Sequence, residues 1–175
     1  MKIISVLLLC LSSFLFKDND SLKNGLVFKV SIRGSYDLPQ ADFVIIDSLR
    51  YYLLDAKLTN HSTTEKKFVS YLFTVVPNIV TDTKYVKTCL NNFGTNYATT
   101  FTLKPGQELN MPIIVQVNNQ NLGIQVKFGW IYMDYDSAER NFEKFFENSR
   151  KTHENVIWSD PIRMNITGDK PYEIR

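Results

Sequence analysis

The sequence predicts an all-β protein: an antiparallel sandwich of two sheets with one short inserted helix. From residue 26 onward, apolar and polar residues alternate with a period of two, as they do in strands with one buried face. Turn-forming residues separate these segments at short spacing, without a helix after each strand, which favours an antiparallel over a parallel sheet. The chain has 175 residues, of which 44% are hydrophobic, so it suits one folded domain and is not a disordered tail.

The alternating segments are expected to turn their apolar residues toward a common core. Val, Ile, Thr, Tyr and Phe fill most of these positions, as is typical of a pleated, half-buried surface. The residues expected to face the core are Leu26, Phe28, Val30 and Ile32; Tyr52, Leu54, Ala56 and Leu58; Val69, Tyr71, Phe73 and Val75; Tyr97, Thr99, Phe101 and Leu103; Leu109, Met111, Ile113, Val115 and Val117; Ile124, Val126, Phe128, Trp130 and Tyr132; Val156, Trp158, Ile162, Met164 and Ile166.

Turns are expected at residues 60–63, 104–107 and 118–121. The Pro-Gly pair of the second suits a type II turn, because proline presets φ and glycine accepts the positive φ that follows. Pro112 and Pro161 fall inside strand-like runs. Proline cannot donate a ladder hydrogen bond, so these strands are expected to be edges or to be bulged.

Residues 137–149 are expected to form the inserted helix, between the last two strands. Asp136, with Glu139 three residues later, has the pattern of a capping box. We expect the helix to dock against one end of the sandwich; a partner-binding or membrane-surface role is the alternative, although its mixed charges do not favour an anionic membrane. The apolar residues that recur at helical spacing are Ala138, Phe142, Phe145 and Phe146.

The first 16 residues predict a secretory signal: a charged start, an apolar run over 3–16 and an abrupt polar boundary. As a helix that run rises about 21 Å, well short of the roughly 30 Å hydrocarbon core of a bilayer. The expected organisation is therefore a signal at 1–16, a polar linker at 17–25, the sandwich domain at 26–168 and a C-terminal tail at 169–175.

Cys10 is a candidate for lipid attachment, because bacterial lipidation uses a cysteine beside the apolar run. The large Leu9 before it argues against this, so cleavage is favoured and membrane anchoring is expected only if Cys10 is lipidated. Cys89 is then the one cysteine of the mature chain and is expected to be a small buried apolar residue without a disulfide partner.

Familiar catalytic and metal-binding patterns are absent from the sequence, which has no GxSxG, no HExxH and only 7 Gly. His61 and His153 are isolated in expected loops. Asp134 and Asp136 could suggest calcium, but Ala138 and Glu139 occupy positions where an EF-hand needs an oxygen ligand and a glycine. A net charge of +2 gives no reason to expect nucleic-acid binding. We therefore expect no enzyme, cofactor or metal.

The aromatic residues offer one alternative, a platform that stacks on sugar rings. Trp130 and Tyr132 share the parity of the buried face, and Trp158 shares that of Ile162, so core packing is favoured. Tyr51 and Tyr135 are the better candidates for exposure.

Two short motifs carry a resemblance. Leu58-Thr59-Asn60 follows a central strand, and Leu103-Lys104-Pro105-Gly106-Gln107 forms a later L-x-PGQ turn. With an export signal, these resemble bacterial exported immunoglobulin-like β-sandwiches of the telokin-like kind. The resemblance implies an immunoglobulin-like fold, an exported location and a non-enzymatic role, and it carries over no binding residue.

The sequence thus predicts an exported, non-enzymatic binding or accessory module of the cell envelope or extracellular space, located in the periplasm, on the cell surface or outside. Its partner is expected to be an unknown protein or glycan. The alternatives are a carbohydrate-binding module with exposed aromatics and, third, an envelope-associated hydrolase whose carboxylates come together across the fold.

Overall fold

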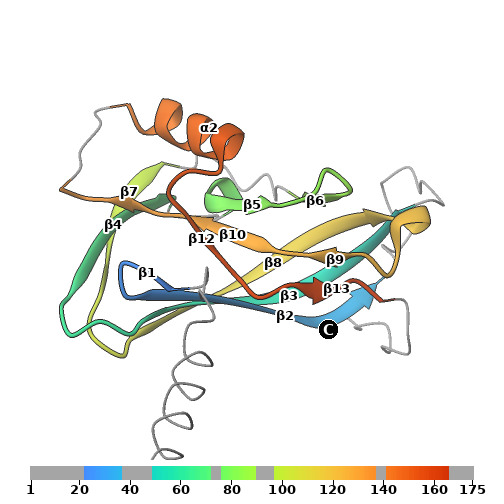
Figure 1. The fold of residues 1–175 in the computed structure, drawn as a ribbon, viewed down its shortest axis with the longest axis horizontal. Coiled ribbons are helices and arrows are strands. Elements are labelled where there is room, and N and C mark those ends of the chain that lie inside the picture. Colours follow the sequence, from blue (N-terminus) through green and yellow to red (C-terminus); the bar gives the residue numbers. More distant parts are fainter. Residues whose placement is uncertain (1–21, 37–48, 72–75, 90–96, 137–140, 166–175) are drawn as a thin grey trace, which may run out of the picture.

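A computed structural model describes residues 22–36, 49–71, 76–89, 97–136 and 141–165 (Figure 1). These residues form mostly antiparallel β-sheet with one α-helix, which confirms the all-β class. The strands lie in two facing layers, and the helix covers the outer side of one of them (Figure 1). The arrangement is therefore sandwich-like with a partial third layer.

The first layer is a five-stranded antiparallel sheet in the order β1-β2-β3-β8-β6. Its strands are β1 (Leu22–Lys23), β2 (Leu26–Tyr36), β3 (Leu49–Asn60), β6 (Val86–Thr88) and β8 (Glu108–Asn118). β1 lies within the segment expected to be a linker, so strand pairing starts before Leu26. Asn24 and Gly25 join β1 to β2 with φ of 57° and 76°, the positive values that a tight two-residue hairpin turn requires.

The second layer consists of three small antiparallel sheets, with strand orders β12-β10-β5, β11-β4-β7 and β13-β9. Two short 3₁₀ turns, η1 (Val76–Asn78) and η2 (Asn119–Asn121), connect neighbouring strands. The strands of this layer are β4 (Lys66–Tyr71), β5 (Ile79–Thr81), β7 (Ala98–Leu103), β9 (Gln125–Val126), β10 (Phe128–Ile131), β11 (Met133–Asp134), β12 (Val156–Trp158) and β13 (Ile162–Arg163).

The main core lies between the two layers. Trp130 of β10 is fully buried, with its ring centroid 6.1 Å from that of Phe28 on β2 and 6.2 Å from that of Phe68 on β4. The inward face predicted for β8 is confirmed from Met111 to Val117, where alternate residues are buried. Period-two alternation thus identified this face of the core correctly.

Strand β10 is buried on both faces, which alternation alone did not predict. Between the inward-facing Phe128 and Trp130 lies Gly129, and a Cβ built there would approach Val156 Cγ1 to 2.3 Å. Ile131 points to the outer side, where a second apolar cluster forms under the helix. The residues of this outer cluster are Val69, Val80, Ile131, Met133, Phe146 and Val156.

The inserted helix is α2 (Phe142–Thr152), which begins and ends later than the expected 137–149. Its N-cap is Asn141, whose side chain accepts a hydrogen bond of 3.1 Å from the backbone N of Lys144; residues 137–140 lie outside the described ranges. α2 lies between β11 and β12 and covers the outer face of the second layer, not one end of the sandwich as expected (Figure 1).

The three phenylalanines of α2 are buried to different degrees. Phe146 is 1% exposed and anchors the outer cluster, Phe145 is half-buried, and Phe142 is 37% exposed. The stripe is therefore only partly covered, because its first residue lies at the rim of the docked face.

The expectation for Pro112 is confirmed among the described strands. Pro112 is exposed on β8, opposite Asp55 of β3. On the other side of β8, the pairing of β6 covers only residues 115–117, so β8 is an edge at the proline. Pro161 lies between β12 and β13, where no ladder bond is needed.

Candidate functional site

The aromatic residues weighed as a sugar platform do not share an exposed surface. Trp130 and Tyr132 are buried in the main core, as their parity predicted, and Trp158 is half-buried beside His153. Tyr135 is 50% exposed at the end of β11, whereas Tyr51 is half-buried on β3. The two residues expected to be exposed thus lie on different layers.

The candidate polar residues are also dispersed. His61 is exposed in the turn after β3, and His153 caps the end of α2 with a positive φ of 60°. Cys89 is half-buried rather than fully buried, and desolvation raises the pKa of its thiol. Cys10, the candidate for lipid attachment, lies outside the described residues.

Asp134 and Asp136 form a local turn rather than a metal site. The backbone N of Asp136 donates to Asp134 Oδ1 at 3.0 Å, and the hydroxyl of Tyr132 donates to Asp134 Oδ2 at 3.2 Å. Burial, together with the charge of Asp134, raises the pKa of Tyr132. Within the described ranges, His, Cys, Asp and Glu nowhere gather in groups of three or more that could hold a metal ion.

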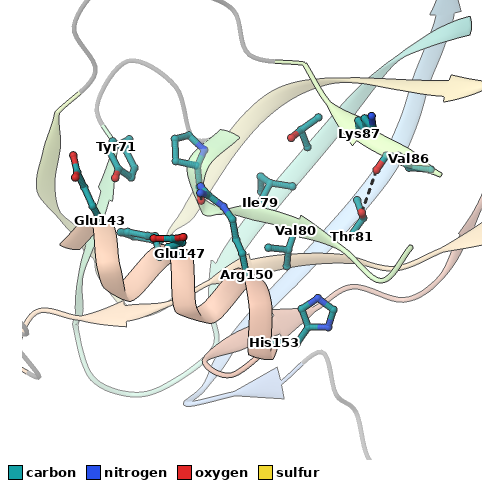
Figure 2. Close-up of a pocket in the computed structure, with 13 residues that line it drawn as sticks. Tyr71, Ile79, Val80, Thr81, Val86, Lys87, Glu143, Glu147, Arg150 and His153 are labelled. Atoms are coloured by element: carbon teal, nitrogen blue, oxygen red, sulfur yellow. Dashed lines mark hydrogen bonds between the residues drawn. The ribbon is translucent and has the colours of Figure 1, made fainter. Parts of the chain in front are cut away.

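A groove of about 680 Å³ lies between α2 and the segment that runs from η1 through β5 to β6 (Figure 2). Glu143, Glu147 and Arg150 of α2 line one side, and residues of β5 and β6 line the other. Its floor is apolar, because Phe146 of α2, Ile79 and Val80 of β5 and Val86 of β6 contribute to it.

The backbone edges of two sheets border this groove. β5 is the last strand of the order β12-β10-β5, and β6 is the last strand of the five-stranded sheet. The two strands are consecutive, and the hydroxyl of Thr81 joins them by donating to the carbonyls of Thr83 at 2.8 Å and Val86 at 3.2 Å. The chain therefore passes from one layer to the other along the groove.

Arg150 is the central cation of the groove. Its Nη2 donates to the carbonyl of Pro77 and so ties α2 to η1. Desolvation by the surrounding protein lowers the pKa of the guanidinium, partly opposed by Tyr71 and Glu147. Desolvation also raises the pKa of Tyr71, which lines the same groove.

Glu147 is engaged with its own helix. Lys151 Nζ lies 2.7 Å from Glu147 Oε1, one helical turn away, and this hydrogen bond holds the pKa of Glu147 below its ordinary value. The carboxylate charge at this wall of the groove is therefore largely offset by a lysine, whereas Arg150 has a neutral carbonyl as its hydrogen-bond partner.

A second hollow of about 740 Å³ lies over the outer face of β2, β3 and β8. Arg33 pairs there with Asp55, and Lys57 pairs with Glu108 at 2.9 Å. These pairs link three strands and match each cation with a carboxylate. Because the charges satisfy one another, this hollow is the weaker candidate.

The sequence gave little warning of the groove. Its walls come from β4, η1, β5, β6 and α2, which are far apart along the chain. β5 and β6 have three residues each, too few to show alternation, and no strand was expected between residues 76 and 89. The one available signal was the helix itself, whose polar residues include Arg150.

Among the residues that the structure describes, no helix combines the length and apolar character needed to cross a bilayer. The sequence matches no protein-family model and no curated protein. Among solved structures, it is similar to that titled "Crystal structure of FixG-related protein from Vibrio parahaemolyticus", with 14% identity and a TM-score of 0.36. That similarity covers 83% of this chain and 100% of the other.

Proposed function

We propose that the protein is an exported, non-enzymatic binding module with an immunoglobulin-like sandwich fold, which acts at the cell envelope or outside the cell. Its ligand binds in the groove between α2 and β5–β6. The observation that carries this proposal is the groove itself, whose volume of about 680 Å³ lies in the range of ligand sites. An apolar floor with polar groups at its rim is typical of such sites.

The polar groups of the groove support binding over catalysis. Arg150 holds η1, the Thr81 hydroxyl holds the turn before β6, and Glu147 pairs with Lys151. These side chains fix the walls in place, which pre-organises the groove and lowers the entropic cost of binding.

The burial of Trp130 and Tyr132 favours this function over a carbohydrate platform, because a platform needs exposed ring faces. The predicted signal at residues 1–16 supports export, and the resemblance of the two turn motifs supports the immunoglobulin-like assignment.

A groove-filling variant tests the proposal. Thr88→Trp places a large ring at the half-buried β6 wall, and Thr102→Trp adds the same ring on an exposed part of β7 outside the groove. Envelope and culture fractions of the native host are passed over the wild type and both variants, and the bound protein and glycan are identified. We expect a component retained by the wild type and by Thr102→Trp but lost with Thr88→Trp, while thermal melts show that both variants fold. A component retained equally by all three overturns the assignment of the groove.

A further inference from the structure

We propose that the groove binds an extended peptide segment of a partner protein, which adds as a strand to the open edge of β5 and places an acidic side chain against Arg150. This proposal rests on the proposed function and names its ligand class. Strand addition is a common mode of peptide recognition, in which backbone hydrogen bonds give affinity and alternate side chains give specificity.

The register of β5 aims backbone groups into the groove. Asp82 N donates to Lys127 O at 3.2 Å, so this pair of residues is a hydrogen-bonded pair of the antiparallel ladder. The next pair, Thr81 and Phe128, is then a non-hydrogen-bonded pair whose backbone groups point away from each other. Phe128 agrees with this, since its N–H and C=O both bond Ser159 on the far side.

The N–H and C=O of Thr81 therefore point to the side of β5 opposite β10. No described strand pairs with β5 on that side, which is where the groove lies. The same alternation applies to β6: Cys89 N donates to Ile114 O at 2.8 Å, so the backbone groups of Thr88 also point away from β8. Two sheet edges thus present backbone donors and acceptors to one groove.

The side chains around the edge fit the two faces of an added strand. Val80 points toward α2 in the outer cluster, whereas Ile79 points into the main core. Alternate side chains of an added strand would follow the same two directions. One set would meet the α2 wall at Phe146 and Arg150, and the other would lie toward β6.

Arg150 supplies the charge complementarity. Its guanidinium has several N–H donors, of which the structure occupies one with the carbonyl of Pro77. No carboxylate of the described residues pairs with it, although the surrounding protein partly desolvates its charge. A carboxylate gains most at a desolvated guanidinium, because planar charge-assisted hydrogen bonds are stronger there than in water.

The test selects peptides from a random decapeptide display library on the purified wild-type protein and measures their dissociation constants. Thr81→Pro removes the outward N–H and also the hydroxyl, whereas Thr81→Val removes only the hydroxyl and serves as its matched control. Arg150→Gln removes the groove cation, and Lys151→Gln removes a charge from the same helix outside the groove. Thermal melts of all four variants accompany the binding measurements.

We expect peptides that carry Asp or Glu, bind Thr81→Val about as well as the wild type, and lose at least about tenfold in affinity on Thr81→Pro, the scale of one backbone hydrogen bond. Arg150→Gln should weaken them by about tenfold or more and Lys151→Gln by less than about twofold, because only Arg150 lines the site. If Thr81→Pro does not fold, N-methylation of successive peptide amides replaces it, and the affinity should fall at alternate positions.

Equal affinity for Thr81→Pro and Thr81→Val, or N-methylation without an alternating effect, overturns strand addition. Selected peptides that lack acidic residues, or bind Arg150→Gln undiminished, overturn the role of Arg150. If Thr88→Trp still abolishes capture of the envelope component in either case, the groove remains the binding site and only its ligand class is wrong. If Thr88→Trp has no effect, the proposed function fails as well.

Discussion

The side-chain amide of Asn60 donates a 2.8 Å hydrogen bond to the carbonyl of Leu103, across 43 residues of sequence. Asn60 ends the first of the two motifs that carried the sequence resemblance, and Leu103 begins the second. Their backbones also meet, because Gly106 N donates to Asn60 O at 2.7 Å and Asn60 N donates to Gln107 O at 3.1 Å. The two motifs are therefore one structural unit, in which Gly106 has the φ of 74° that the predicted type II turn needs.

Replacing Asn60 with alanine should lower the free energy of unfolding by about 3 kcal/mol, because the buried carbonyl of Leu103 loses its donor. The change also removes the acceptor for Ser62 N, at 2.9 Å, and for Ser62 Oγ, at 2.7 Å. Urea denaturation measures the loss. Asn110→Ala on the exposed face of β8 is the control and should stay within about 0.5 kcal/mol. Equal losses in the two variants would show that the corner is not a special source of stability.

Truncations along α2 should have graded effects, because its phenylalanines are buried unequally. Phe146→Ala should cost about 3–5 kcal/mol, the scale of a buried aromatic truncation, whereas Phe142→Ala should cost about 0.5 kcal/mol or less. Phe145→Ala should lie between them. Denaturant melts at low protein concentration measure all three, and a neutral Phe146→Ala would mean that α2 does not hold the outer cluster in solution.

Stability should fall at alkaline pH. Burial raises the pKa of the Cys89 thiol above its ordinary 9.0, and it raises the pKa of Tyr71 and Tyr132 above 10.0. The unfolded chain therefore loses these protons at lower pH than the folded protein does. The stabilisation is complete below about pH 9 and is lost as the pH rises toward the folded-state values.

Melting temperatures measured from about pH 8 to pH 11 check this expectation. Cys89→Ala should flatten the first part of the fall, and Tyr132→Phe should flatten the part above about pH 10. Tyr85→Phe, at a tyrosine that is 48% exposed, is the control and should leave the curve unchanged. Parallel curves for the wild type and Cys89→Ala would assign the fall to other groups.

The export signal stays a prediction of the sequence, because residues 1–16 lie outside the described ranges. Expressed with its own leader, the protein should leave the cytoplasm and lose most or all of these residues, which mass spectrometry of the exported form measures. A fatty-acid probe distinguishes cleavage from lipidation at Cys10, with Cys10→Ser as the control. A soluble cytoplasmic product that still begins at Met1 would contradict export.

Alternation predicted the main core well because one face of each long strand meets the opposite layer. The inward residues of β8 and the burial of Trp130 followed from parity alone. It could not show that Gly129 and Ile131 are buried too, since that depends on α2 covering the second face. Strands buried on both faces have no period-two signal.

The helix shows the other limit of the sequence. Helical spacing found α2, but Asp136 and Glu139 suggested an early start, whereas Asn141 provides the observed cap. Spacing also grouped Phe142 with Phe146, although only Phe146 reaches the outer cluster. The groove depends on the open edge of β5, and edge exposure is a property of strand order rather than of local sequence.

The buried amide of Asn60 also governs how the protein can be produced. Asn60-His61-Ser62 spells the acceptor sequence for N-linked glycosylation, and the sugar would be joined to Asn60 Nδ2. In the folded protein that nitrogen is buried and donates to the carbonyls of Leu103 and Thr64. Folding and glycosylation at Asn60 are therefore mutually exclusive. In a eukaryotic secretory host, chains that receive the sugar before this corner closes would be excluded from the native state, however well the rest of the sequence folds.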